Sequence, residues 1–174
     1  MSMIRVEDLS FSYSSSYDPI FEHVSFSIDT DWKLGFVGRN GRGKTTFLNL
    51  LLGKYEYSGK IISSVPFDYF PYPVSDPTQL TIDALSAICP MAEEWELLRE
   101  LSYLDVDAQI LWRPFETLSN GEQTKALLAA LFLNEGRFLL IDEPTNHLDA
   151  RARKIVAAYL QKKKGFILVS HDRL

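Results

Sequence analysis

The fold of this chain is decided by the stretch Gly38-Arg39-Asn40-Gly41-Arg42-Gly43-Lys44-Thr45. It fits the pattern G-x-x-x-x-G-K-[ST], a loop whose backbone N–H groups surround phosphate oxygens while the lysine reaches the terminal phosphates. Such a loop needs a strand before it and a helix after it. An apolar run, Leu34 to Val37, precedes it, and a helical segment from Thr45 to Leu52 follows and stops at Gly53. We therefore predict a phosphate-binding loop between a strand and a helix, as such a loop requires.

Four further motifs follow the loop in a fixed order, which makes a chance match very unlikely. They are Leu118–Gln123, Phe138–Glu143, Asn146–Asp149 and Ser170–Asp172. Asp142 ends an apolar run, so its carboxylate is expected at the carboxyl edge of a parallel sheet, where α/β proteins bind ligands. We predict that Asp142 and the Thr45 hydroxyl hold Mg²⁺, and that Glu143 orients or deprotonates the attacking water.

The ATP site is predicted to extend beyond the glycine-rich loop. Its expected members are Tyr13, Gly38, Arg39, Asn40, Gly41, Arg42, Gly43, Lys44, Thr45 and Thr46. His171 follows the apolar run 166–169 and is predicted to reach the γ-phosphate, so Glu143, His171 and Lys44 form the predicted catalytic set. For Tyr13, stacking on adenine competes with simple packing on a strand surface.

A second anion site is predicted at the start of another helix. Ser119 and Glu122 have the spacing of a capping box, in which each side chain bonds a backbone N–H of the other residue. Further N–H groups at this helix start remain available to an anion. Nothing in the chain fills that position, so we predict that Ser119, Asn120, Gly121 and Glu122 contact the ATP of a partner.

Composition limits the class of protein. The chain has 174 residues, which suit one domain, and a formal net charge of −5, which gives no overall attraction for nucleic acid or an anionic membrane. Its single cysteine, Cys89, cannot form an internal disulfide and is predicted to be a partly buried apolar residue. No apolar run approaches the roughly 20 residues that span a bilayer. We expect a cytoplasmic protein without membrane insertion.

The pattern along the chain predicts an α/β body with additions. Strands are expected within 3–29, interrupted at 14–19, and at 60–65 and 67–70. Residues 81–115 are predicted to be helical, with Thr81 as the N-cap and an apolar stripe at Trp95, Leu98, Leu101 and Leu104. A helix from Arg153 to Lys164 is expected to carry three lysines in its last turn. The predicted division is a core with a β lobe, 1–73 and 118–174, and a helical lobe, 74–117.

These motifs resemble those of the ATP-binding cassette (ABC) superfamily over the whole chain. Gly38–Thr45 resembles the Walker A loop, Leu118–Gln123 the signature motif and Phe138–Glu143 the Walker B motif with its catalytic glutamate. Asn146–Asp149 is similar to the D-loop, and His171 to the switch histidine. The resemblance implies a P-loop NTPase fold of the ABC type, ATP and Mg²⁺ as ligands, and a head-to-tail pair of cassettes. In such a pair Asp149 and the signature residues face the partner's ATP.

Within the superfamily, the stretch Glu143–Asp149 is similar to the F branch. This implies two cassettes in one polypeptide, with ribosome contacts mostly outside this chain. The segments Trp95–Leu101 and Leu111–Phe115 resemble the first cassette of antibiotic-resistance proteins that protect ribosomes. The chain stops just after His171, so we expect an excised first domain with weak ATPase activity.

The sequence departs from the family pattern at two positions. Phe70-Pro71-Tyr72 stands where the family places a Mg²⁺-sensing glutamine, and Gln79 lies too close to the next helix to replace it. Asn120 occupies the usual glycine position of the signature motif, where asparagine tolerates left-handed backbone. Two alternatives therefore stay open: the ATPase subunit of a transporter, against which the Asn146-His147 pair argues, and a degenerate nucleotide-binding regulatory module.

Overall fold

A computed structural model describes residues 2–37 and 42–171; Gly38, Arg39, Asn40 and Gly41 of the predicted loop lie outside the described residues. The predicted strands within 3–29, at 67–70, and at the apolar runs 34–37, 138–141 and 166–169 are all present. In chain order the elements are β1 (Met3–Phe11), β2 (Phe21–Asp29), β3 (Lys33–Val37), α1 (Arg42–Leu51), β4 (Ser58–Ser63), β5 (Phe67–Phe70), α2 (Thr81–Ile88), α3 (Glu94–Tyr103), the 3₁₀ helices η1 (Ala108–Trp112) and η2 (Phe115–Thr117), α4 (Asn120–Leu133), β6 (Phe138–Asp142), α5 (Ala150–Gln161) and β7 (Phe166–Ser170).

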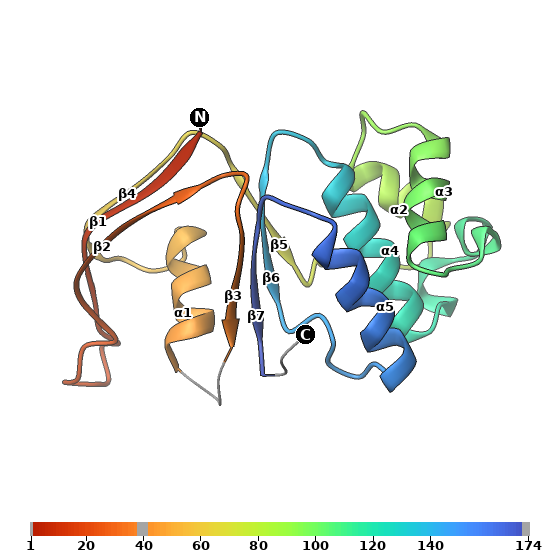
Figure 1. Ribbon diagram of the computed structural model, residues 1–174. Helices are drawn as coiled ribbons and strands as arrows, with labels where there is room; N and C mark the ends of the chain where they lie inside the picture. The colour runs from red at the N-terminus through yellow and green to blue at the C-terminus, as the bar shows by residue number, and fades with distance from the viewer. Residues whose placement is uncertain (1, 38–41, 172–174) are drawn as a thin grey trace.

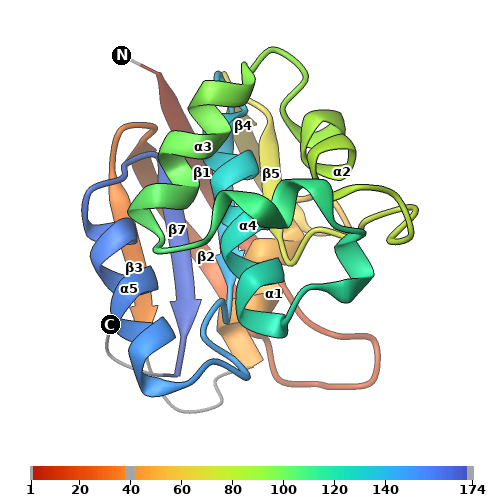
Figure 2. The ribbon, with the colours of Figure 1, turned by 90° about the vertical axis from the view of Figure 1, so that its right-hand side faces the viewer.

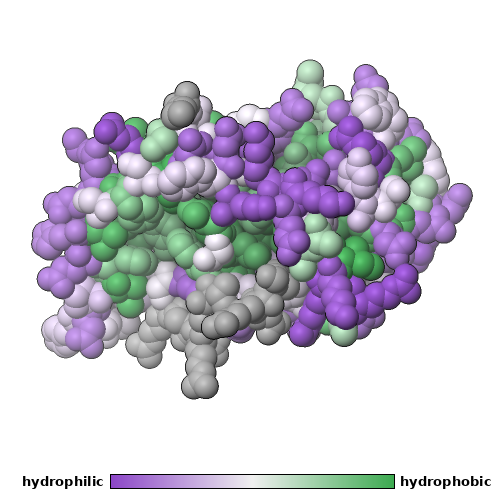
Figure 3. All heavy atoms as spheres, viewed as in Figure 1, coloured by the Kyte–Doolittle hydropathy of each residue, from purple (hydrophilic) through white to green (hydrophobic). Residues whose placement is uncertain are grey.

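The strands form two sheets of different kind. An antiparallel sheet has the order β2-β1-β4, and a parallel sheet has the order β3-β7-β6-β5. Helix α1 lies between the two sheets, whereas α4 and α5 lie on the other side of the parallel sheet (Figure 1). Apolar residues gather over the α1 side of the molecule, and polar residues surround them (Figure 3). This arrangement confirms the predicted α/β body with an antiparallel β lobe.

The parallel sheet is covered on both faces, as its uninterrupted apolar runs predict. In β6, Phe138 and Leu140 join the apolar cluster around α1, while Leu139 and Ile141 join the cluster around α4 and α5. Successive side chains of a strand point to opposite faces, so one apolar run supplies both clusters. The central strands are therefore fixed from two sides, and the loops at their ends have a rigid base.

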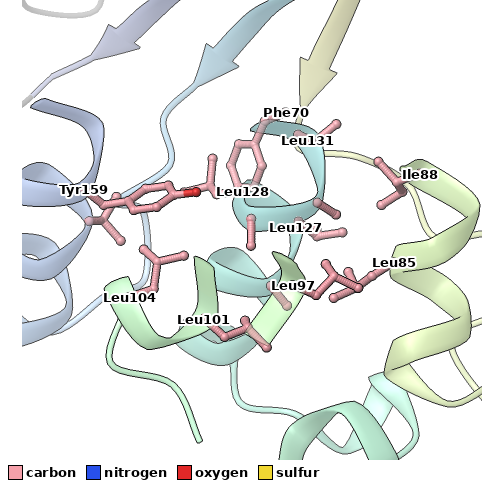
Figure 4. Close-up of a cluster of buried hydrophobic side chains, with 14 of the residues drawn as sticks. Phe70, Leu85, Ile88, Leu97, Leu101, Leu104, Leu127, Leu128, Leu131 and Tyr159 are labelled. Atoms are coloured by element: carbon pink, nitrogen blue, oxygen red, sulfur yellow. The ribbon is translucent and has the colours of Figure 1, made fainter. Parts of the chain in front are cut away.

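Helices α2 and α3 form an outer layer on the side of α4 that faces away from the parallel sheet (Figure 1). Helices α2 and α3 lie over α4 (Figure 2), and side chains of α2, α3 and α4 point toward one another in the same buried cluster (Figure 4). The predicted apolar stripe is partly wrong. Leu101 and Leu104 are buried, but the third member of the buried face is Leu97, and Trp95 is 56% exposed. The indole of Trp95 donates to Glu93.

Two further local predictions are corrected by tertiary contacts. Thr81 is the first residue of α2 and not its N-cap, because its buried hydroxyl donates to the carbonyl of Arg113 at 2.8 Å. Helix α5 runs from Ala150 to Gln161, so the three lysines follow the helix and do not form its last turn. Lys163 instead pairs with Glu100 of α3 at 2.8 Å. Cys89 is buried as predicted, and this burial raises the pKa of its thiol to about 11.

The parallel order of the second sheet determines where the motifs meet. Strands β3, β5, β6 and β7 run in one direction, so their carboxyl ends lie along one edge. The glycine-rich loop, Pro71, Glu143 and His171 follow these ends directly. Within 2–37 and 42–171, no helix combines the length and the apolar character needed to cross a membrane.

Candidate functional site

A cavity of about 820 Å³, called here the main cavity, opens at this edge of the parallel sheet. Its size is within the range of small-molecule sites. The described members of the predicted own-ATP and metal sites that line it are Tyr13, Lys44, Thr45, Thr46, Asp142, Glu143 and His171. These residues come from four separate parts of the chain. The fold therefore brings the predicted catalytic set and the predicted metal ligands to one place.

The phosphate-binding end of the main cavity is the start of α1. Helix α1 begins at Arg42, three residues earlier than predicted, so Lys44, Thr45 and Thr46 occupy its first turns. The first N–H groups of a helix have no partner inside the helix, and its dipole places partial positive charge there. Together these features make a helix start that favours phosphate.

Asp142 offers an oxygen that is suited to a cation. Its Oδ2 atom accepts a hydrogen bond of 2.9 Å from the Tyr69 hydroxyl. Its Oδ1 atom is buried and makes no hydrogen bond with any described residue. An orphaned buried carboxylate oxygen requires a partner, and Mg²⁺ usually takes one or two protein carboxylates together with phosphate oxygens. Asp142 and Thr45, which line the same cavity, therefore fit the predicted Mg²⁺ site.

Glu143 and His171 form a contact pair across the ends of β6 and β7. The His171 backbone N–H donates to Glu143 Oε2 at 3.2 Å, and the ring Nδ1 lies 2.9 Å from Oε1 without hydrogen-bond alignment. The Glu143 N–H donates to the Val169 carbonyl at 2.8 Å. Glu143 has a left-handed backbone, with φ of 50°. These contacts hold its carboxylate in the lining of the main cavity.

Aromatic rings close the side of the main cavity nearest the β lobe. The Tyr13 hydroxyl forms a hydrogen bond with the Thr46 hydroxyl. The Tyr13 ring packs edge-on against Phe11 and Tyr55, with centroid separations of 5.0 and 5.8 Å. Tyr13 therefore packs on β1 and also lines the cavity, and its stacking on adenine stays a prediction.

None of the predicted partner-facing residues lines the main cavity. Ser119 is the N-cap of α4, and it forms the predicted capping box with Glu122, with bonds of 3.1 and 2.9 Å. Asp149 caps α5 by accepting from the Ala152 N–H at 2.7 Å. Asn120 lines a neighbouring cavity of about 460 Å³, together with Tyr72. This neighbouring cavity shares Thr124 and His147 with the main cavity, but no member of the second group of predicted residues lines the main cavity itself.

Several residues of the main cavity are absent from the predicted own-ATP site. They are Asn49, Tyr55, Tyr69, Phe70, Pro71, Thr124, Pro144, Asn146, His147 and Val169. Tyr69 is the most informative, since burial and its hydrogen bond to Asp142 raise its pKa above the ordinary tyrosine value and keep its hydroxyl protonated. The sequence signal that could have pointed to Tyr69 was its hydroxyl group within a short strand that is otherwise largely apolar. Its contact with Asp142 depends on β5 and β6 being neighbours, which no local pattern reveals.

Comparison with known proteins supports the resemblance to the ABC superfamily. The family model described as "ABC transporter" matches residues 21–146. An uncharacterized ABC transporter ATP-binding protein of Schizosaccharomyces pombe is 33% identical, with 98% of this chain and 24% of the relative covered. ABC transporter F family member 5 of Arabidopsis thaliana is 28% identical (99% and 26%), and the ribosome protection protein VmlR of Bacillus subtilis is 33% identical (88% and 29%). The chain spans about a quarter of the length of these relatives.

Solved structures agree at the level of the fold. A putative ABC transporter ATP-binding protein from Pyrococcus furiosus superposes with a TM-score of 0.80 at 23% identity, covering 99% of this chain and 93% of that one. A dimeric bacterial ABC transporter cassette superposes with a TM-score of 0.74 at 17% identity, covering 97% and 88%. Because the family model matches more than half of the chain, the chain belongs to the ABC transporter family, and its relatives include members of the F branch.

Proposed function

We propose that this chain binds ATP with Mg²⁺ in the main cavity and hydrolyses it as one half of a composite site. The observation that carries this proposal is the meeting of the α1 start with Asp142, Glu143 and His171 around a single cavity. A helix start, a cation-binding carboxylate and a general base are the groups that hydrolysis of a phosphoanhydride requires.

Each described residue has a definite task in this proposal. Lys44 and the first N–H groups of α1 bind phosphate oxygens, and Thr45 and Asp142 hold the cation. Mg²⁺, when bound, neutralises charge on the terminal phosphates. Glu143 accepts a proton from water at its carboxylate, which the His171 backbone N–H holds in the cavity lining. Tyr13 contributes an aromatic surface for the adenine.

The second half of the composite site comes from another cassette. Ser119, Asn120, Gly121, Glu122 and Asp149 do not line the main cavity of their own chain. The capping box uses the backbone N–H groups of Ser119 and Glu122, which leaves the first-turn N–H groups of Asn120 and Gly121 for an anion. We assign that anion to ATP on a second cassette, in the same polypeptide or in a head-to-tail dimer.

The wider role that we propose is that of an F-branch ATPase acting on the ribosome, with antibiotic resistance as its outcome. It rests on the F-family relative, on the ribosome protection protein and on Asn146-His147. A subunit of a transporter is the second candidate, since the family model carries that description. If the full-length protein that contains this cassette purifies together with membrane-spanning partners, the second candidate is favoured.

The composite site predicts that ATP turnover per chain rises with protein concentration. Two inactive variants should also restore turnover when mixed: Lys44→Ala, which has lost its own phosphate contact, and Asn120→Glu, which repels the partner's phosphates. In the mixed pair, the Asn120→Glu chain keeps its own Lys44 and receives an intact partner-facing surface. The measurement is phosphate release across a dilution series and across mixing ratios. Rapid turnover that is independent of concentration would contradict the composite site.

A further inference from the structure

The loop after β5 lacks the glutamine that the family pattern places there, and two tyrosines lie close to that position. Tyr72 occupies the position in sequence, yet it does not line the main cavity. It lines the neighbouring cavity and packs against the apolar cluster around α4. Tyr69, three residues earlier, lines the main cavity and packs against the cluster around α1. The tyrosine that reaches the site is therefore Tyr69.

Tyr69 is held in place from three directions. Its backbone is part of β5, in parallel register with Leu140 of β6, two residues before Asp142. Its hydroxyl donates to Asp142 Oδ2 at 2.9 Å. The ammonium group of Lys54, just beyond α1, lies 5.2 Å from the centre of its ring, within the range of a cation–π contact. A side chain fixed in this way can fix its hydrogen-bond partner in turn.

The hydrogen bond makes the two oxygens of Asp142 unequal. Oδ2 is engaged by the hydroxyl, and this charge-assisted bond restricts rotation of the carboxylate. Oδ1 is left buried and without a hydrogen-bond partner among the described residues. Carboxylate ligands of metals are commonly oriented by such outer hydrogen bonds, whose loss weakens metal affinity by about 10- to 100-fold.

We propose that Tyr69 is a positioning residue that turns Asp142 Oδ1 toward a divalent cation bound with the nucleotide. The inference rests on the proposed Mg·ATP site and adds a role for β5 in it. In this proposal the tyrosine hydroxyl does not ligate the metal and acts on the carboxylate through its hydrogen bond to Oδ2. Its function is to preset the geometry of the carboxylate before the cation arrives.

The test uses Tyr69→Phe, which removes the hydroxyl and keeps the ring over which Lys54 lies. Mn²⁺ is titrated into the chain carrying one equivalent of a non-hydrolysable ATP analogue, and bound Mn²⁺ is measured by electron paramagnetic resonance. We expect Tyr69→Phe to weaken Mn²⁺ binding about tenfold or more. Affinity for the analogue in EDTA should stay within about twofold of the parent chain, because the variant leaves Lys44 and the α1 start intact.

Two comparisons make the result decisive. Tyr72→Phe is the matched control and should bind Mn²⁺ as the parent chain does. Asp142→Asn should weaken Mn²⁺ binding, and adding Tyr69→Phe to it should have little further effect, because the hydroxyl acts through the carboxylate. If Tyr69→Phe binds Mn²⁺ as tightly as the parent chain, the positioning role of Tyr69 is wrong, while the proposed function stands. Failure of the folded parent chain to bind the analogue would overturn the proposed function, and the inference with it.

Discussion

Replacing Glu143 with glutamine is expected to lower ATP turnover by about 100-fold or more, because a general base contributes about 10²- to 10⁴-fold to a rate. Glutamine has the shape of glutamate, but it cannot accept the proton of the attacking water. The backbone N–H of His171 can still donate to the side-chain oxygen, so the local structure should persist. ATP affinity should therefore remain close to that of the parent chain.

The matched control for this prediction is Glu135→Gln, which removes a carboxylate from an exposed position after α4. Phosphate release is measured for both variants at one protein concentration, and ATP binding is measured separately. If Glu143→Gln hydrolyses ATP as fast as Glu135→Gln, Glu143 is not the base. If it binds ATP much more weakly, its role lies in nucleotide binding.

Replacing Lys163 with methionine is expected to lower the free energy of unfolding by about 3 kcal/mol, as breaking a buried ion pair typically does. Glu100 of α3 is only 2% exposed. It accepts a hydrogen bond of 2.6 Å from the Tyr159 hydroxyl and pairs with Lys163 at 2.8 Å. Burial, followed by the bond to Glu100, raises the pKa of Tyr159 above its ordinary value. Without Lys163, a buried carboxylate would lose its closest cation.

Urea denaturation of Lys163→Met and Lys164→Met tests this prediction. Lys164 lies 3.6 Å from Asp31 with both side chains exposed, and such pairs contribute below about 1 kcal/mol. A double variant that combines Glu100→Gln with Lys163→Met should be less destabilised than Lys163→Met alone, because no buried carboxylate remains and Arg99, the other cation beside Glu100, is exposed to solvent. Destabilisation by Lys163→Met that is no larger than that by Lys164→Met, and below about 1 kcal/mol, would contradict the predicted contribution of the Glu100–Lys163 pair.

Sequence patterns predict those features that depend on local residues. The strands β6 and β7 are evident from uninterrupted apolar runs, and the capping box of α4 from the spacing of Ser119 and Glu122. The meeting of Asp142 and His171 at one sheet edge follows from the parallel arrangement that those apolar runs favour. Local chemistry and strand direction together are sufficient for these parts.

Features that depend on distant partners could not be predicted. Helical spacing fits a stripe through Trp95 as well as one through Leu97, and only packing against α4 selects Leu97. The lysines after α5 look like a solvated helix end until Glu100 of α3 is placed beside Lys163. In the same way, the role of Tyr69 depends on strand order, since β5 lies next to β6.

The measurement that tests the Mg·ATP site most directly is calorimetric titration of the chain with ATP in the presence of Mg²⁺. We predict saturable binding of one ATP per chain. Lys44→Ala should weaken this binding about tenfold or more, because it removes a charge-assisted contact with phosphate. A folded parent chain that shows no saturable binding, or a Lys44→Ala variant that binds ATP as tightly as the parent chain, would contradict the site at the start of α1.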